Sequence, residues 1–224
     1  MQLAFSFTAH NQEKFTEKNF ILTPENSSAF KFLEKFFNQE DYSATQFPIM
    51  IIKGEENSGK THLLNIFANK YQAEFIDKEI LNDNNPLNIF ANNKFFIVDD
   101  YSQIKEEERI LSLINSANEA RVFLLLADDN QRKFNLKDLN SRLKNIFATE
   151  VKNPSHETMK ILIANQLSIQ QIKLSTDLLE DIISNTPRSY IEIDSIIKKI
   201  NFLYNEVGEK ISKNNLAKIF NFKK

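Results

Sequence analysis

The sequence contains no cysteine, which excludes disulfide bonds and metal sites built on thiolates. Its three histidines, His10, His62 and His156, are far apart and lack the spacing of metal ligands. The formal net charge is only −2, so no overall positive field draws the chain toward nucleic acid, although a local basic patch remains compatible with this value. Composition therefore argues against disulfide-stabilised, thiolate-metal and strongly basic proteins.

A targeting segment and a long apolar run are also absent from the sequence. Polar and charged side chains such as Gln2, His10 and Glu17 interrupt the first twenty residues, which excludes the apolar region of a signal peptide. The longest apolar runs, for example residues 122–127, are far shorter than the ~20 residues that a membrane-spanning helix requires. We therefore expect a cytoplasmic protein that is not embedded in a membrane.

Apolar runs and helical periodicity alternate along the first part of the chain. Hydrophobic residues make up 42% of the sequence, enough to bury the core of an α/β domain and a small second domain. Strands are predicted at 47–52, 73–76, 95–98 and 122–126, and helices at 27–37, from about residue 60, and at 104–116. This alternation predicts an α/β fold with a parallel sheet sandwiched between helices.

Only helical periodicity follows Asn153-Pro154. Helices are predicted at 156–169, 176–185, 188–205 and 212–221, with caps at Thr176, Ser189 and Ser212. We therefore divide the chain into an extended segment at 1–24, an α/β domain at 25–152 and a small all-α domain at 153–224.

One segment matches the phosphate-loop pattern G-x-x-x-x-G-K-S/T: Gly54-Glu-Glu-Asn-Ser-Gly59-Lys60-Thr61. Two of the chain's three glycines occupy the two required positions. Glycines let backbone N–H groups turn toward phosphates, and the following helix N-terminus favours an anion. A chance Gly-Lys-Thr in a loop is the alternative. The residues expected to bind the nucleotide are Gly54, Asn57, Ser58, Gly59, Lys60, Thr61 and His62, with Lys60 reaching the β- and γ-phosphates.

Asp99-Asp100 follows the predicted strand at 95–98 and is the second part of this expected site. Thr61 is predicted to bind Mg²⁺, Asp99 to hold the same ion through water, and Asp100 to orient an attacking water. A plain turn after a strand is the alternative.

Glu55 and Glu56 add two carboxylates to the phosphate loop. These carboxylates either face solvent, or they weaken the affinity for nucleotide and increase its dependence on magnesium. Together the motifs predict a site for ATP or ADP with Mg²⁺.

These motifs resemble the DnaA-related AAA+ family, which implies a P-loop AAA+ core followed by a helical lid. The resemblance rests on Gly59-Lys60-Thr61-His62-Leu63-Leu64, Val98-Asp99-Asp100 and Leu125-Leu126-Ala127-Asp128, and it spans roughly residues 1–220. Leu136-Lys-Asp-Leu-Asn-Ser-Arg142-Leu143 resembles the Ser-Arg-Leu segment of the Hda subgroup, whose members inactivate the initiator DnaA.

The resemblance implies roles for three residues. Asp128 matches the first sensor of the γ-phosphate, Arg142 the arginine finger that acts on a neighbouring subunit's ATP, and Arg188 the second sensor. Five of the 28 basic residues are arginines, against 23 lysines, and two of the five fall at these positions. Surface ion pairing is the alternative for Arg142, and charge compensation or a cap contact at a helix end is the alternative for Arg188. The loop before Arg142 is shorter than the family pattern and lacks its prolines.

The segment Gln2-Leu3-Ala4-Phe5-Ser6-Phe7 resembles the peptide with which Hda-type proteins bind the sliding clamp. Such peptides insert leucine and aromatic anchors into an apolar pocket, and their glutamine makes polar contacts. The expected partner-binding residues are Gln2, Leu3, Phe5 and Phe7. The alternative is an edge strand that carries the three apolar residues on one face.

Three functions are compatible with these features. The leading hypothesis is a clamp-bound regulator that promotes hydrolysis of ATP on DnaA, with at most weak ATPase activity of its own. The second is an autonomous AAA+ ATPase that loads or remodels a replication protein such as a helicase, and the third is a non-hydrolysing interaction module.

No initiator-type helix-turn-helix segment follows the lid, so we expect no direct sequence-specific DNA binding. The family also allows a homo-oligomer through its AAA+ interface.

Overall fold

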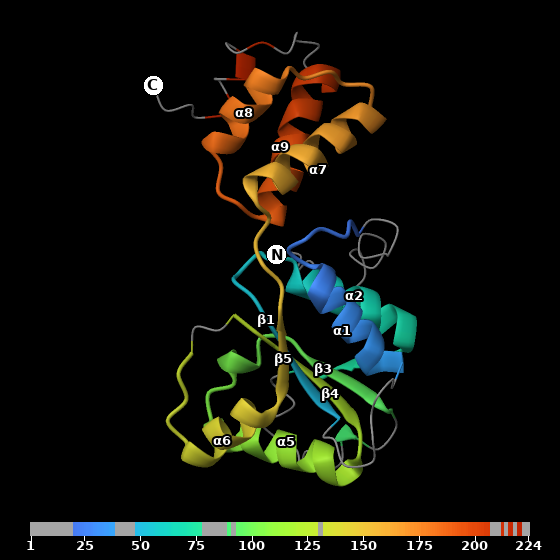
Figure 1. Ribbon diagram of the computed structural model, residues 1–224, viewed down its shortest axis with the longest axis vertical. Coiled ribbons are helices and arrows are strands. Elements are labelled where there is room, and N and C mark those ends of the chain that lie inside the picture. The colour runs from blue at the N-terminus through green and yellow to red at the C-terminus, as the bar shows by residue number, and fades with distance from the viewer. Residues whose placement is uncertain are drawn as a thin grey trace, which may run out of the picture. The chain divides into compact units, whose positions relative to one another are not determined.

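The computed structural model describes residues 20–38, 48–77, 89–90, 93–129, 132–206, 212, 215–216 and 219–220. The chain forms two compact units, residues Met1–Val151 and Lys152–Lys224 (Figure 1). Among the described residues, no helix combines the length and the apolar character needed to cross a bilayer. The expected clamp-binding residues Gln2, Leu3, Phe5 and Phe7 lie outside the described residues, as does much of the helix predicted at 212–221.

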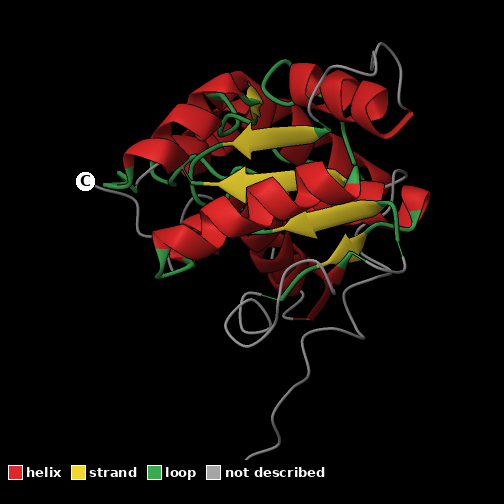
Figure 2. Cartoon of the chain, turned by 90° about the horizontal axis from the view of Figure 1, so that it is seen from below, coloured by secondary structure: helices red, strands yellow, loops and turns green. Residues whose placement is uncertain are grey.

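The described part of the first unit contains a sheet of five parallel strands in the order β2-β3-β4-β1-β5 (Figure 2). The strands are β1 (Ile49–Lys53), β2 (Glu74–Phe75), β3 (Phe95–Val98), β4 (Phe123–Asp128) and β5 (Phe147–Glu150). All of β4 is buried, as expected for a central strand of a parallel sheet. Since the strands are parallel, the carboxyl ends of β1, β3 and β4 meet at one edge.

Two pairs of helices cover the two faces of this sheet (Figure 1). α1 (Ser27–Asn38) and α2 (Lys60–Tyr71) pack on one face, and α5 (Glu107–Ala120) and α6 (Lys137–Asn145) pack on the other. Alternate residues of β1, β3 and β4 enter the two cores: in β1, Met50 and Ile52 face α1 and α2, whereas Ile49 and Ile51 face α5 and α6. The predicted α/β sandwich is confirmed.

The sequence patterns missed two elements, β5 and α6. Strand β5 is an edge strand that pairs only with β1, and of its four residues only Thr149 is buried. Helix α6 buries only Leu139. Elements at the periphery of a sheet bury little apolar surface, so they carry a weak hydrophobic pattern. Helix α5 begins later than predicted because a 3-10 turn, η2 (Tyr101–Gln103), precedes it.

The second unit is all helical in its described residues, as predicted. Its helices are α7 (His156–Ile169), α8 (Thr176–Ser184) and α9 (Tyr190–Asn201), followed by the π-helical turn η3 (Phe202–Glu206). The cap predicted at Thr176 is wrong: Ser175 Oγ accepts from Leu178 N, because the helix begins at Thr176 itself. Ser189 caps α9 as predicted, and Ser212 Oγ accepts from Asn215 N.

Candidate functional site

Three segments with predicted site residues meet at the carboxyl edge of the sheet. Strand β4 lies between β1 and β3, and Lys53 of β1 is in register with Asp128 of β4. Just beyond this pair, Gly54 N donates to Asp128 O at 3.2 Å. Asp99 directly follows β3. The fold therefore brings the phosphate loop, the aspartate pair and Asp128 to one edge.

The phosphate loop is tightly packed and sharply turned. A Cβ atom at Gly54 would lie 2.3 Å from Val151 O and 2.7 Å from Ser58 Oγ, so only glycine fits without movement of the backbone. Asn57, at φ 62°, and Gly59, at φ 93°, adopt left-handed conformations that turn the chain into α2. The close contact at Gly54 and the left-handed backbone at Asn57 and Gly59 therefore define the shape of the phosphate loop.

Lys60 lies at the centre of the loop and is only 6% exposed. Its Nζ donates to the carbonyl oxygens of Gly54, at 2.6 Å, and Glu55, at 2.9 Å. Helix α2 starts at Lys60, and its N-cap Gly59 provides no side-chain cap, so the first-turn N–H groups can serve an anion. Glu55 and Glu56 are exposed, which matches the alternative in which both carboxylates face solvent.

Thr61 and Asp99 join the loop to the end of β3. Thr61 Oγ1 donates to Asp99 Oδ2 at 2.8 Å, which places a hydroxyl oxygen beside a carboxylate, and Mg²⁺ prefers such oxygen ligands. No group of three or more histidine, cysteine, aspartate or glutamate residues suited to a metal occurs in the described residues. The Thr61 hydroxyl and the Asp99 carboxylate are therefore the oxygen groups at this edge that could hold a magnesium ion. Asp100, next in sequence, has a left-handed backbone at φ 52°.

Asp128 and His62 are shielded from solvent in different ways. Asp128 is 3% exposed, and the Tyr101 hydroxyl donates to its Oδ2 at 3.4 Å. Burial, together with the nearby Asp128 carboxylate, raises the pKa of Tyr101, so the phenol remains a donor at neutral pH.

His62 lies on α2, and its ring is edge-on to the Phe20 ring, with 5.5 Å between the ring centroids. Burial lowers the pKa of His62 and favours its neutral form.

The two predicted catalytic arginines lie in different units. Arg142 is exposed in the last turn of α6 and, with Leu111, Asn115, Asp138 and Ser141, lines a surface hollow of about 330 Å³. Arg188 is exposed in the second unit, directly before the cap residue Ser189. The contact of Arg188 with a nucleotide stays a prediction.

Sequence comparison finds relatives among replication initiators, although no protein-family model matches the chain. The chain is 24% identical to DnaA of Helicobacter hepaticus in an alignment 228 positions long, gaps included, that covers 89% of this chain and 49% of that protein. It is also 24% identical to DnaA of Wolinella succinogenes, over 88% of this chain and 50% of that protein. The chain thus spans about half the length of the curated relatives it matches.

Structural comparison identifies the fold. AMPPCP-bound DnaA from Aquifex aeolicus superposes with a TM-score of 0.69 at 21% identity, over 86% of this chain and 66% of that one. Domain III of Thermotoga maritima DnaA gives 0.68 at 17% identity, over 94% of this chain and 98% of that one. The chain has a DnaA-like AAA+ fold. The likeness extends to the Thermotoga maritima RuvB branch migration motor, with a TM-score of 0.66, so it does not single out the Hda subgroup.

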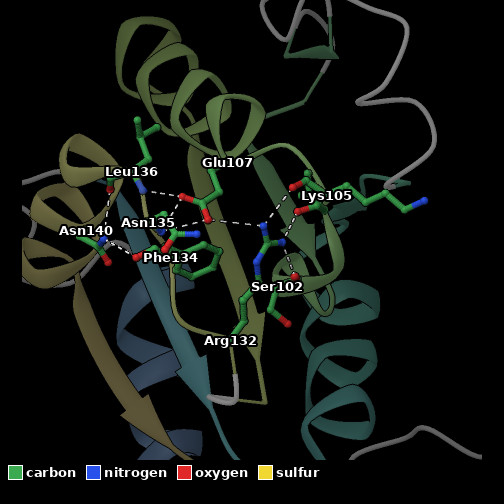
Figure 3. Close-up of polar contacts among 9 residues, drawn as sticks. Ser102, Lys105, Glu107, Arg132, Phe134, Asn135, Leu136 and Asn140 are labelled. Atoms are coloured by element: carbon green, nitrogen blue, oxygen red, sulfur yellow. Dashed lines mark hydrogen bonds and ion pairs between the residues drawn. The ribbon is translucent and has the colours of Figure 1, made fainter.

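Within this DnaA-like fold, the sequence patterns missed Arg132, which follows β4 (Figure 3). Arg132 Nη1 donates to Ser102 O at 2.7 Å and to Ile104 O, and Nη2 donates to Lys105 O at 3.0 Å. Its guanidinium carbon lies 5.0 Å from the centre of the Phe134 ring. The amino-acid composition could have drawn attention to Arg132, because it is one of only five arginines in a lysine-rich chain.

Gly54→Ala should destabilise the first unit. The added methyl group meets Val151 O at 2.3 Å, so the backbone between β1 and β5 has to move. We expect the free energy of unfolding to fall by about 1–3 kcal/mol in urea denaturation. Glu56→Ala, at an exposed position of the same loop, serves as the control and should change stability by less than about 0.5 kcal/mol. Equal stability of the two variants would show that the loop does not pack this closely.

Proposed function

We propose that this protein is a cytoplasmic regulator of replication initiation that binds ATP or ADP with Mg²⁺ and promotes hydrolysis of ATP held by DnaA. The contacts of Lys60 with the loop carbonyls and of Thr61 with Asp99 carry the nucleotide part of the proposal. Similarity to DnaA, which has been solved bound to AMPPCP, supports both the ligand class and the replication context.

In this proposal residues 25–152 form the nucleotide-binding domain and residues 153–224 form its lid. Lys60 would exchange its carbonyl contacts for β- and γ-phosphate oxygens, and Thr61 and Asp99 would hold Mg²⁺. Asp100 would orient a water, and Asp128 would sense the γ-phosphate from the edge of the sheet. Arg188 would contact the nucleotide from the lid. The nucleotide then acts mainly as a conformational switch.

Thr61→Val and Asp99→Asn should each weaken Mg²⁺-dependent ATP binding. Thr61→Val removes the hydroxyl ligand, and Asp99→Asn removes the negative charge that would hold Mg²⁺ through water. The affinity measured by calorimetry with Mg²⁺ should therefore fall roughly tenfold or more, whereas the affinity in EDTA should change little. Asn69→Ala, at an exposed position of the same helix, is the matched control. Unchanged Mg²⁺-dependent affinity in both variants would refute the assignment of the metal ligands.

Arg142 is the proposed group that acts on DnaA. A guanidinium is permanently charged and can donate two hydrogen bonds at once, so it suits the charge that develops on a transferred phosphoryl group. Arg142 is exposed on α6 and is therefore accessible to ATP held by another chain. In the reaction a water oxygen bonds to the γ-phosphorus while the bond to the bridging oxygen breaks. The products are ADP and inorganic phosphate, a proton passes to solvent, and DnaA is left in its ADP form.

Arg142→Ala should abolish this stimulation. Arginine fingers accelerate hydrolysis by ~10³–10⁵, and the variant should lose an effect of that order. The readout is single-turnover phosphate release from DnaA preloaded with labelled ATP, at saturating amounts of this protein. Lys144→Ala, also exposed on α6, is the control for loss of a positive charge. Full stimulation by Arg142→Ala would rule out the arginine-finger role.

The segment Gln2–Phe7 is the proposed anchor on the sliding clamp. Its alternation of polar and apolar residues supports insertion of Leu3, Phe5 and Phe7 into an apolar pocket. We expect the intact chain to bind the clamp with a Kd of about 1 µM or tighter and the double variant Gln2→Ala/Leu3→Ala to lose binding in surface plasmon resonance. Ser6→Ala, between the anchors, should bind normally. Absence of binding by the intact chain would favour a loader or an interaction module.

A further inference from the structure

The segment that leads into α6 is held by side chains rather than by regular secondary structure. Residues 132–136 form neither helix nor strand. Arg132 attaches this segment to the carbonyls of Ser102, Ile104 and Lys105 (Figure 3). Those carbonyls belong to η2 and the turn after it, which directly follow Asp99-Asp100. Arg132 therefore connects the chain after β4 to the chain after β3.

Glu107, the first residue of α5, holds the beginning of α6 (Figure 3). Its carboxylate accepts from Asn135 N at 2.8 and 3.0 Å and from Leu136 N at 2.6 Å. Leu136 is the N-cap of α6. The backbone donors of Leu136 and Asn135, together with the Arg132 guanidinium 3.7 Å away, lower the pKa of Glu107 and keep it charged at neutral pH.

Further contacts extend this arrangement to Asp128. The Phe134 ring stacks on Tyr101 with a centroid distance of 6.0 Å and an interplanar angle of 13°. Tyr101 in turn donates to Asp128. Asn140 Nδ2 donates to the carbonyls of Phe134 and Leu136, which fastens the first turn of α6 to the same segment. The start of α6 is thus connected, through Phe134 and Tyr101, to Asp128 of β4 and, through Arg132, to the segment that follows Asp99-Asp100.

These ties add to a limited apolar anchorage of α6. Leu139 is its only buried residue, and Leu143 is partly buried against the same core, so the polar contacts help to set the direction of the helix. Arg142 lies six residues after Leu136, which corresponds to about 9 Å along a helix axis. If the start of α6 moved and the helix tilted, the Arg142 side chain would be displaced. Lysine should replace Arg132 only in part, because the guanidinium reaches the three carbonyls from two separate nitrogens whereas an ammonium donates from a single one.

We propose that Arg132 and Glu107 are positioning residues that aim Arg142 by fixing the start of α6 to the edge of the sheet that carries Asp99 and Asp128. This inference rests on the proposed function of Arg142. In the proline-free segment 132–136, Arg132 and Glu107 supply the contacts that hold the chain before α6.

The test is single-turnover hydrolysis of ATP on DnaA, measured over a range of concentrations of this protein. Arg132→Gln and Glu107→Gln should each lower the saturated rate by roughly 10- to 100-fold, the cost of a displacement near 1 Å. The concentration for half-maximal stimulation and the protein's own ATP affinity should stay at parental values. Arg109→Gln is the matched control, because Arg109 pairs with Glu106 at an exposed site on the same helix α5.

The ATP affinity and the free energy of unfolding separate positioning from general destabilisation. A positioning variant should lower the saturated rate while both of these quantities stay near their parental values, whereas a destabilised chain should lose both. Arg132→Lys should recover only part of the parental rate. A parental rate in both Arg132→Gln and Glu107→Gln, alongside its loss in Arg142→Ala, would overturn this inference and leave the proposed function intact. Stimulation that survives Arg142→Ala would instead overturn the proposed function, and the inference with it.

Discussion

The site in the first unit depends on the burial of β4 between β1 and β3. All six residues of β4 are buried, and its parallel pairing on both sides fixes where the neighbouring strands end. Its alternating side chains divide the interior into two cores, one under each pair of helices. The same pairing puts Gly54, Asp99 and Asp128 at one edge. A shift of register in β4 would therefore disturb both cores and the candidate site at once.

Side-chain hydrogen bonds then convert this edge into a connected polar region. Lys60 bonds to the loop carbonyls, Thr61 to Asp99, and Tyr101 to Asp128. Arg132 and Glu107 carry the connection on to α6. Each bond joins segments that are far apart in sequence or closes a loop on itself. These bonds hold the segments that follow β1, β3 and β4 in fixed positions relative to one another.

The DnaA-like fold defines an architecture, and function depends on residues displayed on it. The fold is shared with initiators and with a branch migration motor, at identities of 15–21%. The fold therefore does not distinguish a regulator from an initiator or a loader, and the proposal for this chain depends on individual residues such as Arg142 on α6. Arg142 is well placed for such a role because it is exposed, whereas Lys60 and Asp128 are buried.

The sequence alone determined the features that are encoded locally. The phosphate loop is a contiguous pattern, and the helix predicted at 156–169 coincides with α7 because its apolar residues repeat at helical spacing. Strands β1, β3 and β4 were identified because they are buried on both faces and read as continuous apolar runs. Strand β5, helix α6 and the Arg132–Glu107 contacts were decided by tertiary structure. Arg132 bonds to carbonyls 27 to 30 residues away, and only the pairing of β3 with β4 brings them within reach.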